Sequence, residues 1–325
     1  MPETSPKYIK VPILGVIFFS LVLVVVSVYA GIAWTKLKSG SVVTTSATAT
    51  ATFATTKTDK AKLQFFVMSF CPYGNQMEDI LRPIFDLLGN KTDIQPQYIF
   101  DKVTGSLADY CKPRVGDPTQ CATYVTNKYF TTEDECKKTI ATNLAQCVDE
   151  KSYIKISDSF YTSLHGRVEA NQNIREICAW NQTTDKKQWW DFVANVNKNC
   201  TAQNADTCWE EQAKKASLDT AKITECFNKD AQSLIEKEIA LTTQYQVSGS
   251  PTVLVNGLPF PPEAAYTQDG KGTLKIGTKT ATQDKYRTPN VIKEAVCASF
   301  NKAPKECNTV LNELSGQAPA AGGCG

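Results

Sequence analysis

The sequence contains no C-x-x-C pair, and His165 is the only histidine in its 325 residues. Zinc and iron–sulfur sites usually draw on closely spaced cysteines and histidines, so we expect no metal site. No motif indicates another cofactor. A cluster of basic residues is also missing, and the formal net charge is only +2. Proteins that bind nucleic acid concentrate Lys and Arg on one face, so we expect no nucleic-acid partner.

Cysteine, in contrast, is abundant: the chain has twelve, spread from Cys71 to Cys324. Widely spaced cysteines favour disulfides, which persist in oxidising compartments. The sequence therefore predicts a domain outside the cytoplasm, in a periplasm, in a lumen or at a cell surface.

Charge is missing from one long segment near the N-terminus. Residues 11–34 read VPILGVIFFSLVLVVVSVYAGIAW, with no charged side chain. Such a run is long enough to cross a bilayer as a helix, and we expect a single-pass anchor after a short tail of residues 1–10. Lysines flank the run on both sides, so the expected orientation rests on the cysteines. The alternative is a signal peptide cleaved near Ala30, which would release a secreted protein.

Low-complexity segments frame the expected domain. Residues 35–61 are rich in Thr, Ala and Ser and predict a flexible linker. Residues 304–325 end in SGQAPAAGGCG and predict a flexible tail. We expect residues 62–303 to form one domain, with a Cys-rich insertion at 101–160 and a helical insertion at 161–246.

The first part of this domain has the pattern of a β-α-β unit. LQFFVMSF (63–70) predicts a buried central strand, and a helix with apolar residues at helical spacing follows Cys71 and ends near Gly89. Pro83 is expected to kink that helix. Residues 93–100 predict a second, parallel strand, which Pro96 places at the edge of the sheet.

The last part predicts two further strands and a helix. VSGSPTVLVNG (247–257) indicates a turn and a strand that ends in a hairpin at Asn256-Gly257. Residues 273–277 predict a strand and residues 290–300 a closing helix. The expected layout is α/β with a single sheet.

Cys71 is the candidate nucleophile because it lies between a buried strand and the start of a helix. Unpaired N–H groups and the helix dipole at that position stabilise a thiolate, which is the form that attacks disulfides. Pro72 fits the first helical turn without losing a hydrogen bond. The alternative is that Cys71 is a structural cysteine, buried or bridged.

Ser250-Pro251 precedes a strand in the second half of the domain. A cis proline beside a redox cysteine would leave neighbouring backbone groups free to pair with an extended substrate. The alternative is an ordinary trans proline at the start of a strand.

Together, the strand-CPY-helix segment and the SP-strand-NG segment resemble the thioredoxin fold, with a helical insertion of the kind found in DsbA-like proteins. Residues 163–178 are similar to the signature of the gamma-interferon-inducible lysosomal thiol reductase (GILT) family, C-Q-H-G-x-x-E-C-x-x-N-x-x-x-x-C. The residues in matching places are His165, Gly166, Glu169, Asn173 and Cys178. Ser163, Leu164 and Ala170 replace the other signature residues. The resemblance implies a thioredoxin-like α/β fold and thiol–disulfide chemistry.

A second resemblance concerns CAWNQTTDKKQWWDFVANVNKNC (178–200). This segment looks like the thioredoxin-like lumenal domain of plant vacuolar sorting receptors, which bind cargo. The two resemblances cover about residues 62 to 300, apart from the 101–160 insertion. They imply the fold more specifically than the activity.

Gly74 departs from the redox family, where a second cysteine in this place resolves the mixed disulfide. Resolution here would need an outside thiol, the substrate's second thiol or another cysteine of this chain. Cys324, in the glycine-rich tail, is the candidate for the last role. The other ten cysteines are enough for five bridges, for which sequence proximity favours local pairs. These are Cys111–Cys121, Cys136–Cys147, Cys200–Cys208, Cys178–Cys226 and Cys297–Cys307.

The remaining candidates have weaker support. Tyr73 is expected to tune access to Cys71 or to contact substrate, in a groove formed by Pro72, Tyr73, Gly74, Ser250 and Pro251. His165 is a candidate general base, but a His-Gly at a helix start is more often structural. The tryptophans Trp180, Trp189, Trp190 and Trp209 are expected to pack in the core.

The expected function is a membrane-anchored, extracytoplasmic thiol–disulfide oxidoreductase that acts through Cys71. Its partners would be protein or peptide thiols and disulfides, with an external thiol reductant or redox partner. One alternative is a non-catalytic thioredoxin-like module that binds a peptide or protein in the same groove. Another is a surface protein that presents the 101–160 insertion to a partner.

Overall fold

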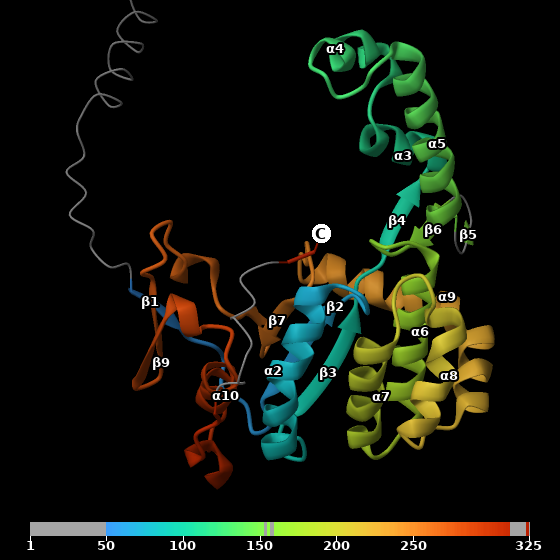
Figure 1. The fold of residues 1–325 in the computed structure, drawn as a ribbon. Coiled ribbons are helices and arrows are strands. Elements are labelled where there is room, and N and C mark those ends of the chain that lie inside the picture. Colours follow the sequence, from blue (N-terminus) through green and yellow to red (C-terminus); the bar gives the residue numbers. More distant parts are fainter. Residues whose placement is uncertain (1–49, 153–154, 157–158, 313–322, 325) are drawn as a thin grey trace, which may run out of the picture. The chain divides into compact units, whose positions relative to one another are not determined.

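The computed structural model describes residues 50–152, 155–156, 159–312 and 323–324. Its central element is a four-stranded sheet. Its strand order is β3-β2-β7-β8 (Figure 1), with β2 (Lys62–Val67), β3 (Asp93–Tyr98), β7 (Thr252–Val255) and β8 (Leu258–Pro259). β2 pairs parallel with β3 and antiparallel with β7. The predicted central strand and the edge position of Pro96 are confirmed.

Helix α2 (Pro72–Leu88) connects β2 to β3 and packs against the last helix, α10 (Pro289–Ala298). One face of α2 is buried, including Met77, Leu81 and Ile84, as the helical spacing predicts. Pro83 lies inside α2, and the helix continues through it to Leu88. Both helices are where the sequence pattern placed them.

Four helices form the second insertion: α6 (Arg167–Gln182), α7 (Lys186–Asn199), α8 (Ala205–Lys215) and α9 (Thr220–Gln244). α6 packs against α9 and α7 against α8, with Trp189 and Trp190 buried between the insertion and Phe65 of β2. The Cys178–Cys226 and Cys200–Cys208 bridges join these helices, and both were predicted. The core position of Trp209 is also confirmed, and Trp180 is partly buried against the same cluster.

The Cys-rich insertion forms a helical unit on a small sheet. The helices are α3 (Leu107–Val115), α4 (Cys121–Thr126) and α5 (Glu133–Lys151), with a 3-10 turn at Pro118–Gln120; the sheet order is β4-β6-β5, from β4 (Asp101–Thr104), β6 (Ser159–Thr162) and β5 (Lys155–Ile156). Its disulfides are Cys111–Cys147 and Cys121–Cys136, so the two predicted local pairs are wrong. The connectivity is nested because α5 packs back along α3 and α4, which brings its second half to Cys111 and its first turn to Cys121.

A second sheet lies outside the central one and corrects two expectations. β1 (Thr50–Phe53) pairs parallel with β9 (Thr273–Ile276), which pairs antiparallel with β10 (Lys279–Thr282). The chain therefore has more than the single sheet expected, and part of the predicted linker is a strand. Threonine and phenylalanine favour strands, and Phe53 is buried edge-on against Phe260 with ring centroids 5.0 Å apart. Short 3-10 turns at Glu263–Ala265 and Gln283–Lys285 border this sheet in the sequence.

The segment after α10 is also more ordered than the predicted tail. It forms a 3-10 turn at Lys305–Asn308, and Cys307 is bonded to Cys297 as predicted. The buried ammonium of Lys293 donates hydrogen bonds to the backbone oxygens of Cys307 and Thr309.

The predicted anchor at 11–34 and the start of the linker lie outside the described residues. Within the described ranges, no helix is both long enough and apolar enough to cross a membrane.

Candidate active site

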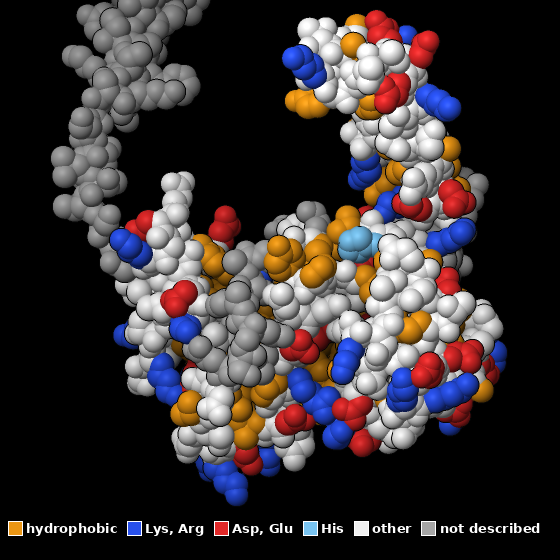
Figure 2. Space-filling model, viewed as in Figure 1, with side chains coloured by type: hydrophobic (Ala, Val, Ile, Leu, Met, Phe, Trp, Pro, Cys, Tyr) orange, Lys and Arg blue, Asp and Glu red, His pale blue; other side chains and the backbone are white. Residues whose placement is uncertain are grey.

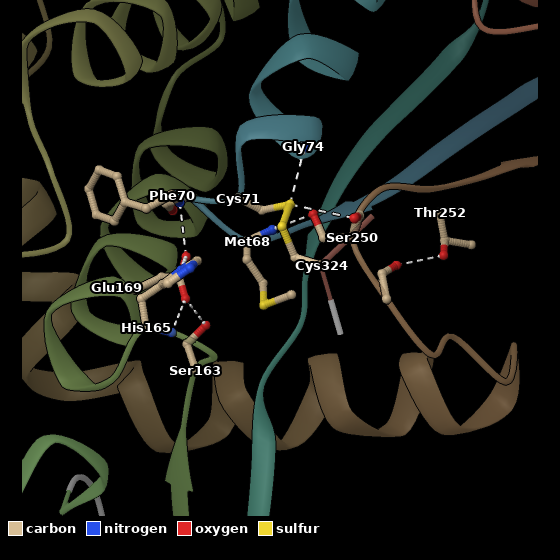
Figure 3. The surroundings of a disulfide bond; sticks show 12 residues. Met68, Phe70, Cys71, Gly74, Ser163, His165, Glu169, Ser250, Thr252 and Cys324 are labelled. Carbon is tan, nitrogen blue, oxygen red and sulfur yellow. Dashed lines mark hydrogen bonds and ion pairs between the residues drawn. A yellow bond between two sulfur atoms is a disulfide. The ribbon is translucent and has the colours of Figure 1, made fainter. Parts of the chain in front are cut away.

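The candidate site lies where the central strand β2 gives way to helix α2 (Figure 3). Cys71 is the N-cap residue of α2, and Pro72 is in its first turn. The backbone N–H of Gly74 donates to the Cys71 sulfur, with an N–S distance of 3.4 Å. No acidic residue lies in the first turn of α2. This arrangement favours the thiolate of Cys71 whenever its disulfide is open.

Cys71 is bonded to Cys324, 253 residues later in the chain. The backbone N–H of Ser250 donates to the carbonyl of Cys324, and the N–H of Cys324 donates to the carbonyl of Ser250, both at 2.7 Å. These two bonds form an isolated antiparallel bridge, beside a Ser250–Pro251 peptide bond that is cis. Cys324 is thus held through its sulfur and through its backbone.

Ser250 also fills the space beside Gly74. Its hydroxyl accepts a hydrogen bond from the backbone N–H of Met68 at 3.1 Å. A Cβ atom added at Gly74 would lie 2.7 Å from the Ser250 hydroxyl oxygen, closer than van der Waals contact allows. Any side chain at position 74, including a second cysteine, therefore requires Ser250 to move.

Two side chains of α6 hold the turn that precedes Cys71. The carboxylate of Glu169 accepts a hydrogen bond from the N–H of Phe70 at 2.9 Å. The amide oxygen of Asn173 accepts from the N–H and the hydroxyl of Ser69, at 3.0 and 2.7 Å. Glu169 and Asn173 are fully buried. Because an unpaired buried N–H costs about 1–3 kcal/mol, these bonds fix the turn.

His165 reaches this turn through Glu169 (Figure 3). Its Nδ1 lies 2.9 Å from Glu169 Oε1, and the Ser163 hydroxyl donates to Oε2 at 2.7 Å. The hydrogen bond to Glu169 raises the pKa of His165, although partial burial opposes this. Burial alone would raise the pKa of Glu169, but the hydrogen bonds from His165 and Ser163 outweigh it and lower that pKa. The pH range in which His165 is protonated and Glu169 is ionised is therefore wider than it would be with the ordinary pKa values of the two groups.

Two further carboxyl groups lie buried behind the turn. Glu176 of α6 accepts from the Ser69 hydroxyl at 3.1 Å and from the Tyr98 hydroxyl at 2.7 Å, and burial raises its pKa to about 7. Glu238 of α9 accepts from the N–H of Tyr98 at 2.9 Å, and burial also raises its pKa to about 7. Neither glutamate was predicted from the sequence, because glutamate on a helix usually lies in solvent. The spacing of residues 169, 173 and 176 along one helix face was the available signal.

Residues 106–260 match the family model of the vacuolar sorting receptor thioredoxin-like domain. The matched region holds most of the Cys-rich insertion, the four-helix insertion and the strand after Pro251, and it begins after Cys71. Before the matched region, β2, α2 and β3 supply a β-α-β unit. β7 and β8 lie within it, and α10 follows it and completes a β-β-α arrangement. The fold is thioredoxin-like.

Solved structures similar to this thioredoxin-like chain include three bacterial proteins. The reduced disulfide bond oxidoreductase DsbG of Mycobacterium tuberculosis is 13% identical, with 80% of this chain and 92% of that chain covered at a TM-score of 0.40. Reduced DsbA from the same organism is 13% identical, with 80% and 92% covered at a TM-score of 0.39. A putative protein disulfide isomerase from Nitrosomonas europaea is 11% identical, with 69% and 88% covered at a TM-score of 0.33. None of the curated protein sequences matches this chain.

The thioredoxin-like fold brings most of the predicted site residues to one place. Cys71, Pro72 and Gly74 start α2, and Ser250, Pro251 and Cys324 lie opposite them. The Tyr73 side chain next to them is 37% exposed, and Leu164, beside His165, is 38% exposed. Figure 2 shows hydrophobic side chains gathered next to the pale-blue histidine on this face. The roles of these residues in catalysis stay predictions, as does the resemblance to GILT.

A cavity of about 600 Å³ opens on the other side of Pro251. It lies between β1, the β7–β8 hairpin and the loop that follows the hairpin. Apolar and aromatic side chains dominate its lining, including Phe53, Tyr245, Pro251, Leu258, Phe260 and Tyr266. The sequence does not predict this cavity, because β1 belonged to the expected linker.

The described cysteines are all in disulfides. In the part of the chain that the structure describes, no group of three or more His, Cys, Asp or Glu side chains is placed to hold a metal ion.

Proposed function

We propose that this protein is a thiol–disulfide oxidoreductase in which Cys71 exchanges disulfides with protein or peptide substrates. Cys324 is the second thiol of its redox pair. The observation that carries this proposal is the Cys71–Cys324 bond at the N-terminus of α2, with the backbone of Cys324 paired to Ser250. A cysteine far away in sequence thus takes the place of the missing second cysteine at Gly74.

The exchange proceeds in two balanced steps. A substrate thiolate attacks the Cys71 sulfur and forms a substrate–Cys71 disulfide, while Cys324 leaves as a thiolate and takes up a proton. A second substrate thiolate then attacks the substrate sulfur of that mixed disulfide, and Cys71 leaves as a thiolate. Two electrons pass from the substrate dithiol to the enzyme, and the reverse sequence reduces a substrate disulfide. An external thiol or redox partner resets the enzyme.

The residues around Cys71 have supporting roles in this scheme. The N–H of Gly74 and the start of α2 stabilise the Cys71 thiolate as it leaves. Glu169 and Asn173 position the preceding turn, and His165 acts through Glu169. Pro72, Tyr73, Gly74, Ser250 and Pro251 line the groove that receives the substrate.

The test is a redox titration of the full-length chain in glutathione buffers, with cysteines labelled and mapped by mass spectrometry. We expect Cys71 and Cys324 to become labelled together, while the other five bridges remain closed. Cys324→Ser should still capture a substrate disulfide: the Cys71 thiolate attacks one substrate sulfur and forms a mixed disulfide, and the other substrate sulfur leaves as a thiolate. Cys71→Ser should not form this mixed disulfide. A matched control removes the bridge between the end of α7 and α8 with Cys200→Ser/Cys208→Ser. Capture that persists in Cys71→Ser would contradict the proposal.

A second candidate function is a non-catalytic module that binds a protein or peptide. The observation that favours it is that the family match covers residues 106–260 and leaves out Cys71. In that case Cys71→Ser and Cys324→Ser would leave partner binding unchanged. Deletion of the Cys-rich insertion would separate binding by that insertion from binding in the groove.

We further propose that residues 11–34 anchor the chain in a membrane and that the thioredoxin-like domain lies outside the cytoplasm. The uncharged run and the six disulfides support this. Carbonate washing of membranes from expressing cells tests the anchor. A chain that stays in the pellet supports it, and a soluble chain that begins near residue 31 would identify a cleaved signal peptide instead.

A further inference from the structure

The backbone bridge between Cys324 and Ser250 shows how a cysteine segment lies in this site. The pairing is antiparallel, and both of its hydrogen bonds involve backbone atoms only. Any extended peptide whose cysteine is bonded to Cys71 can make the same two bonds. The tail therefore provides a template for the position and direction of a substrate peptide.

The same bridge restricts the residue that precedes the cysteine. In the tail this residue is Gly323, and a Cβ atom added there would lie 3.2 Å from the carbonyl oxygen of Ser250. That distance is tighter than ordinary van der Waals contact, and the partner atom belongs to the backbone, which yields less readily than a side chain. Glycine fits without adjustment, and a β-branched side chain would crowd the bridge most.

The antiparallel direction also determines where the earlier residues of the peptide go. With the cysteine opposite Ser250, the residues before it run past Pro251 toward Thr252. Pro251 and Thr252 line the 600 Å³ cavity, together with Tyr245, Leu258, Phe260 and Tyr266. Leu258 and Tyr266 are 44% and 43% exposed, so this apolar surface faces solvent. An apolar side chain two or three residues before the cysteine would cover it.

From these contacts we infer that the site selects extended peptides in which glycine precedes the reactive cysteine and apolar residues precede the glycine. This inference rests on the proposed reaction of Cys71 with peptides. The glycine is selected by the close approach to Ser250, and the apolar residues are selected by the cavity beside Pro251. The oxidised tail occupies the Ser250 position itself, so the peptide enters when the Cys71–Cys324 bond opens.

The test uses the full-length Cys324→Ser chain in mild detergent, in which Cys71 loses its partner. The probes are synthetic peptides whose single cysteine carries a thionitrobenzoate group as a mixed disulfide. The Cys71 thiolate attacks the peptide sulfur, forms the Cys71–peptide disulfide and releases the coloured thionitrobenzoate thiolate. The peptides end in Phe-Leu-Gly-Cys, Phe-Leu-Val-Cys or Ser-Asp-Gly-Cys. Each rate is divided by the rate of the same peptide with free glutathione.

We expect the Phe-Leu-Gly-Cys peptide to react fastest, and valine in place of glycine to slow the reaction by about tenfold. The charged flank should slow it as well. Leu258→Asp should remove the difference between the two flanks and leave the glycine-to-valine ratio unchanged. Val310→Asp is the matched control, since Val310 is 70% exposed and lies outside the cavity lining.

Equal normalised rates for all three peptides would overturn the inference. So would a flank difference that persists in Leu258→Asp, because another surface would then hold the flank. These outcomes differ from a failure of the proposed function. In that case Cys71 would not react even with the small symmetric reagent, dithiobis(nitrobenzoate).

Discussion

At the scale of single residues, Gly74 and Ser250 leave no room for a second cysteine three positions after Cys71. The Ser250 hydroxyl receives the N–H of Met68 and lies where a side chain at position 74 would point. The serine at position 250 therefore requires a glycine at position 74. The disulfide partner of Cys71, Cys324, comes from a distant part of the chain.

This coupling predicts a non-additive pair of substitutions. Gly74→Ala alone should destabilise the fold by roughly 1–3 kcal/mol, because its Cβ meets the Ser250 hydroxyl. In a Ser250→Ala background the same change should cost little, since alanine favours a helix over glycine by about 1 kcal/mol. Urea unfolding of the four proteins of this double-mutant cycle measures the difference. An equal cost in both backgrounds would show that the two residues do not compete for space.

The His165–Glu169 pair predicts a pH dependence of stability. The pKa of His165 is raised above 6.5, so its stabilising contribution is complete below that pH and is lost as the pH rises through the raised value. The pKa of Glu169 is lowered below 4.5, so its contribution is complete above that pH and is lost as the pH falls through the lowered value. Both contributions are present together between pH 4.5 and pH 6.5.

Replacing His165 by Gln should therefore cost most in that window, and less at higher pH. The cost should be at most about 1 kcal/mol, because the imidazole is more than a third exposed. Urea unfolding of both proteins from pH 4 to pH 9 checks this. A cost that does not change with pH would mean that the imidazole acts through packing alone.

The sequence is enough to identify Cys71, Ser250 and Pro251 as site residues, because each lies at a boundary between recognisable elements. It also identifies Cys324 as a candidate, since Cys324 is a lone cysteine in a glycine-rich tail. The sequence does not predict the hydrogen bonds of Glu169 and Asn173 to the turn before Cys71. They join residues about 100 positions apart, and no local pattern encodes such a pair.

At the scale of elements, α6 acts as a support for the turn before Cys71. Asn173→Ala removes the acceptor for the N–H of Ser69 and the donor to the carbonyl of Ile99, both of which are buried. We expect a loss of about 2–4 kcal/mol in unfolding free energy, since each unpaired group costs about 1–3 kcal/mol. The control is Asn171→Ala on the same helix, whose hydrogen bonds to Asp206 lie at the surface and should cost under about 1 kcal/mol. Similar losses of unfolding free energy in the two variants would show that Asn173 does not support the turn.

Helix α9 makes a different prediction through Glu238. Its pKa of about 7 in the fold, against 4.5 ordinarily, means that folding becomes less favourable as the pH rises from 4.5 to 7. Glu238→Gln keeps an acceptor for the N–H of Tyr98 and removes this penalty. The variant should match the wild type near pH 4 and exceed it above pH 7 by up to about 3 kcal/mol. The control is Glu236→Gln on the exposed face of the same helix, whose stability relative to the wild type should not change with pH. If the stability gain of Glu238→Gln also did not change with pH, water would reach the Glu238 carboxylate.

The sequence predicted elements well where the pattern is local, and failed where distant segments meet. The strand and helix around Cys71, the hairpin at Asn256-Gly257 and helix α10 all follow from periodicity and turn residues. β1 is only four residues long, and it is a strand because β9 supplies a partner. The nested disulfides of the Cys-rich insertion depend on how α5 packs against α3 and α4. Sequence proximity does not reveal that packing.

At the scale of the whole molecule, the Cys71–Cys324 bond closes a very long loop. The chain-entropy treatment of a cross-link gives about 5.5 kcal/mol for the sequence separation of 253 between Cys71 and Cys324, and roughly 2.5 kcal/mol for the separation of 8 between Cys200 and Cys208. We therefore expect Cys324→Ser to lower the unfolding free energy more than Cys200→Ser/Cys208→Ser does. Urea unfolding without reductant compares them. The reverse order would mean that the tail bond constrains the unfolded chain less than its length implies.

The same bond sets the path of a mechanical load. A force applied between the two ends of the protein would pass from residue 71 directly to residue 324 through the sulfurs. β1 and β2 precede Cys71 and lie on that path, whereas the other described strands, the helices and the other five bridges lie between residues 71 and 324 and are bypassed. Once the bond is reduced, the load would run through the whole domain and extend it. In a pulling experiment, one reduction event would therefore turn a short, stiff connector into a long, extensible one.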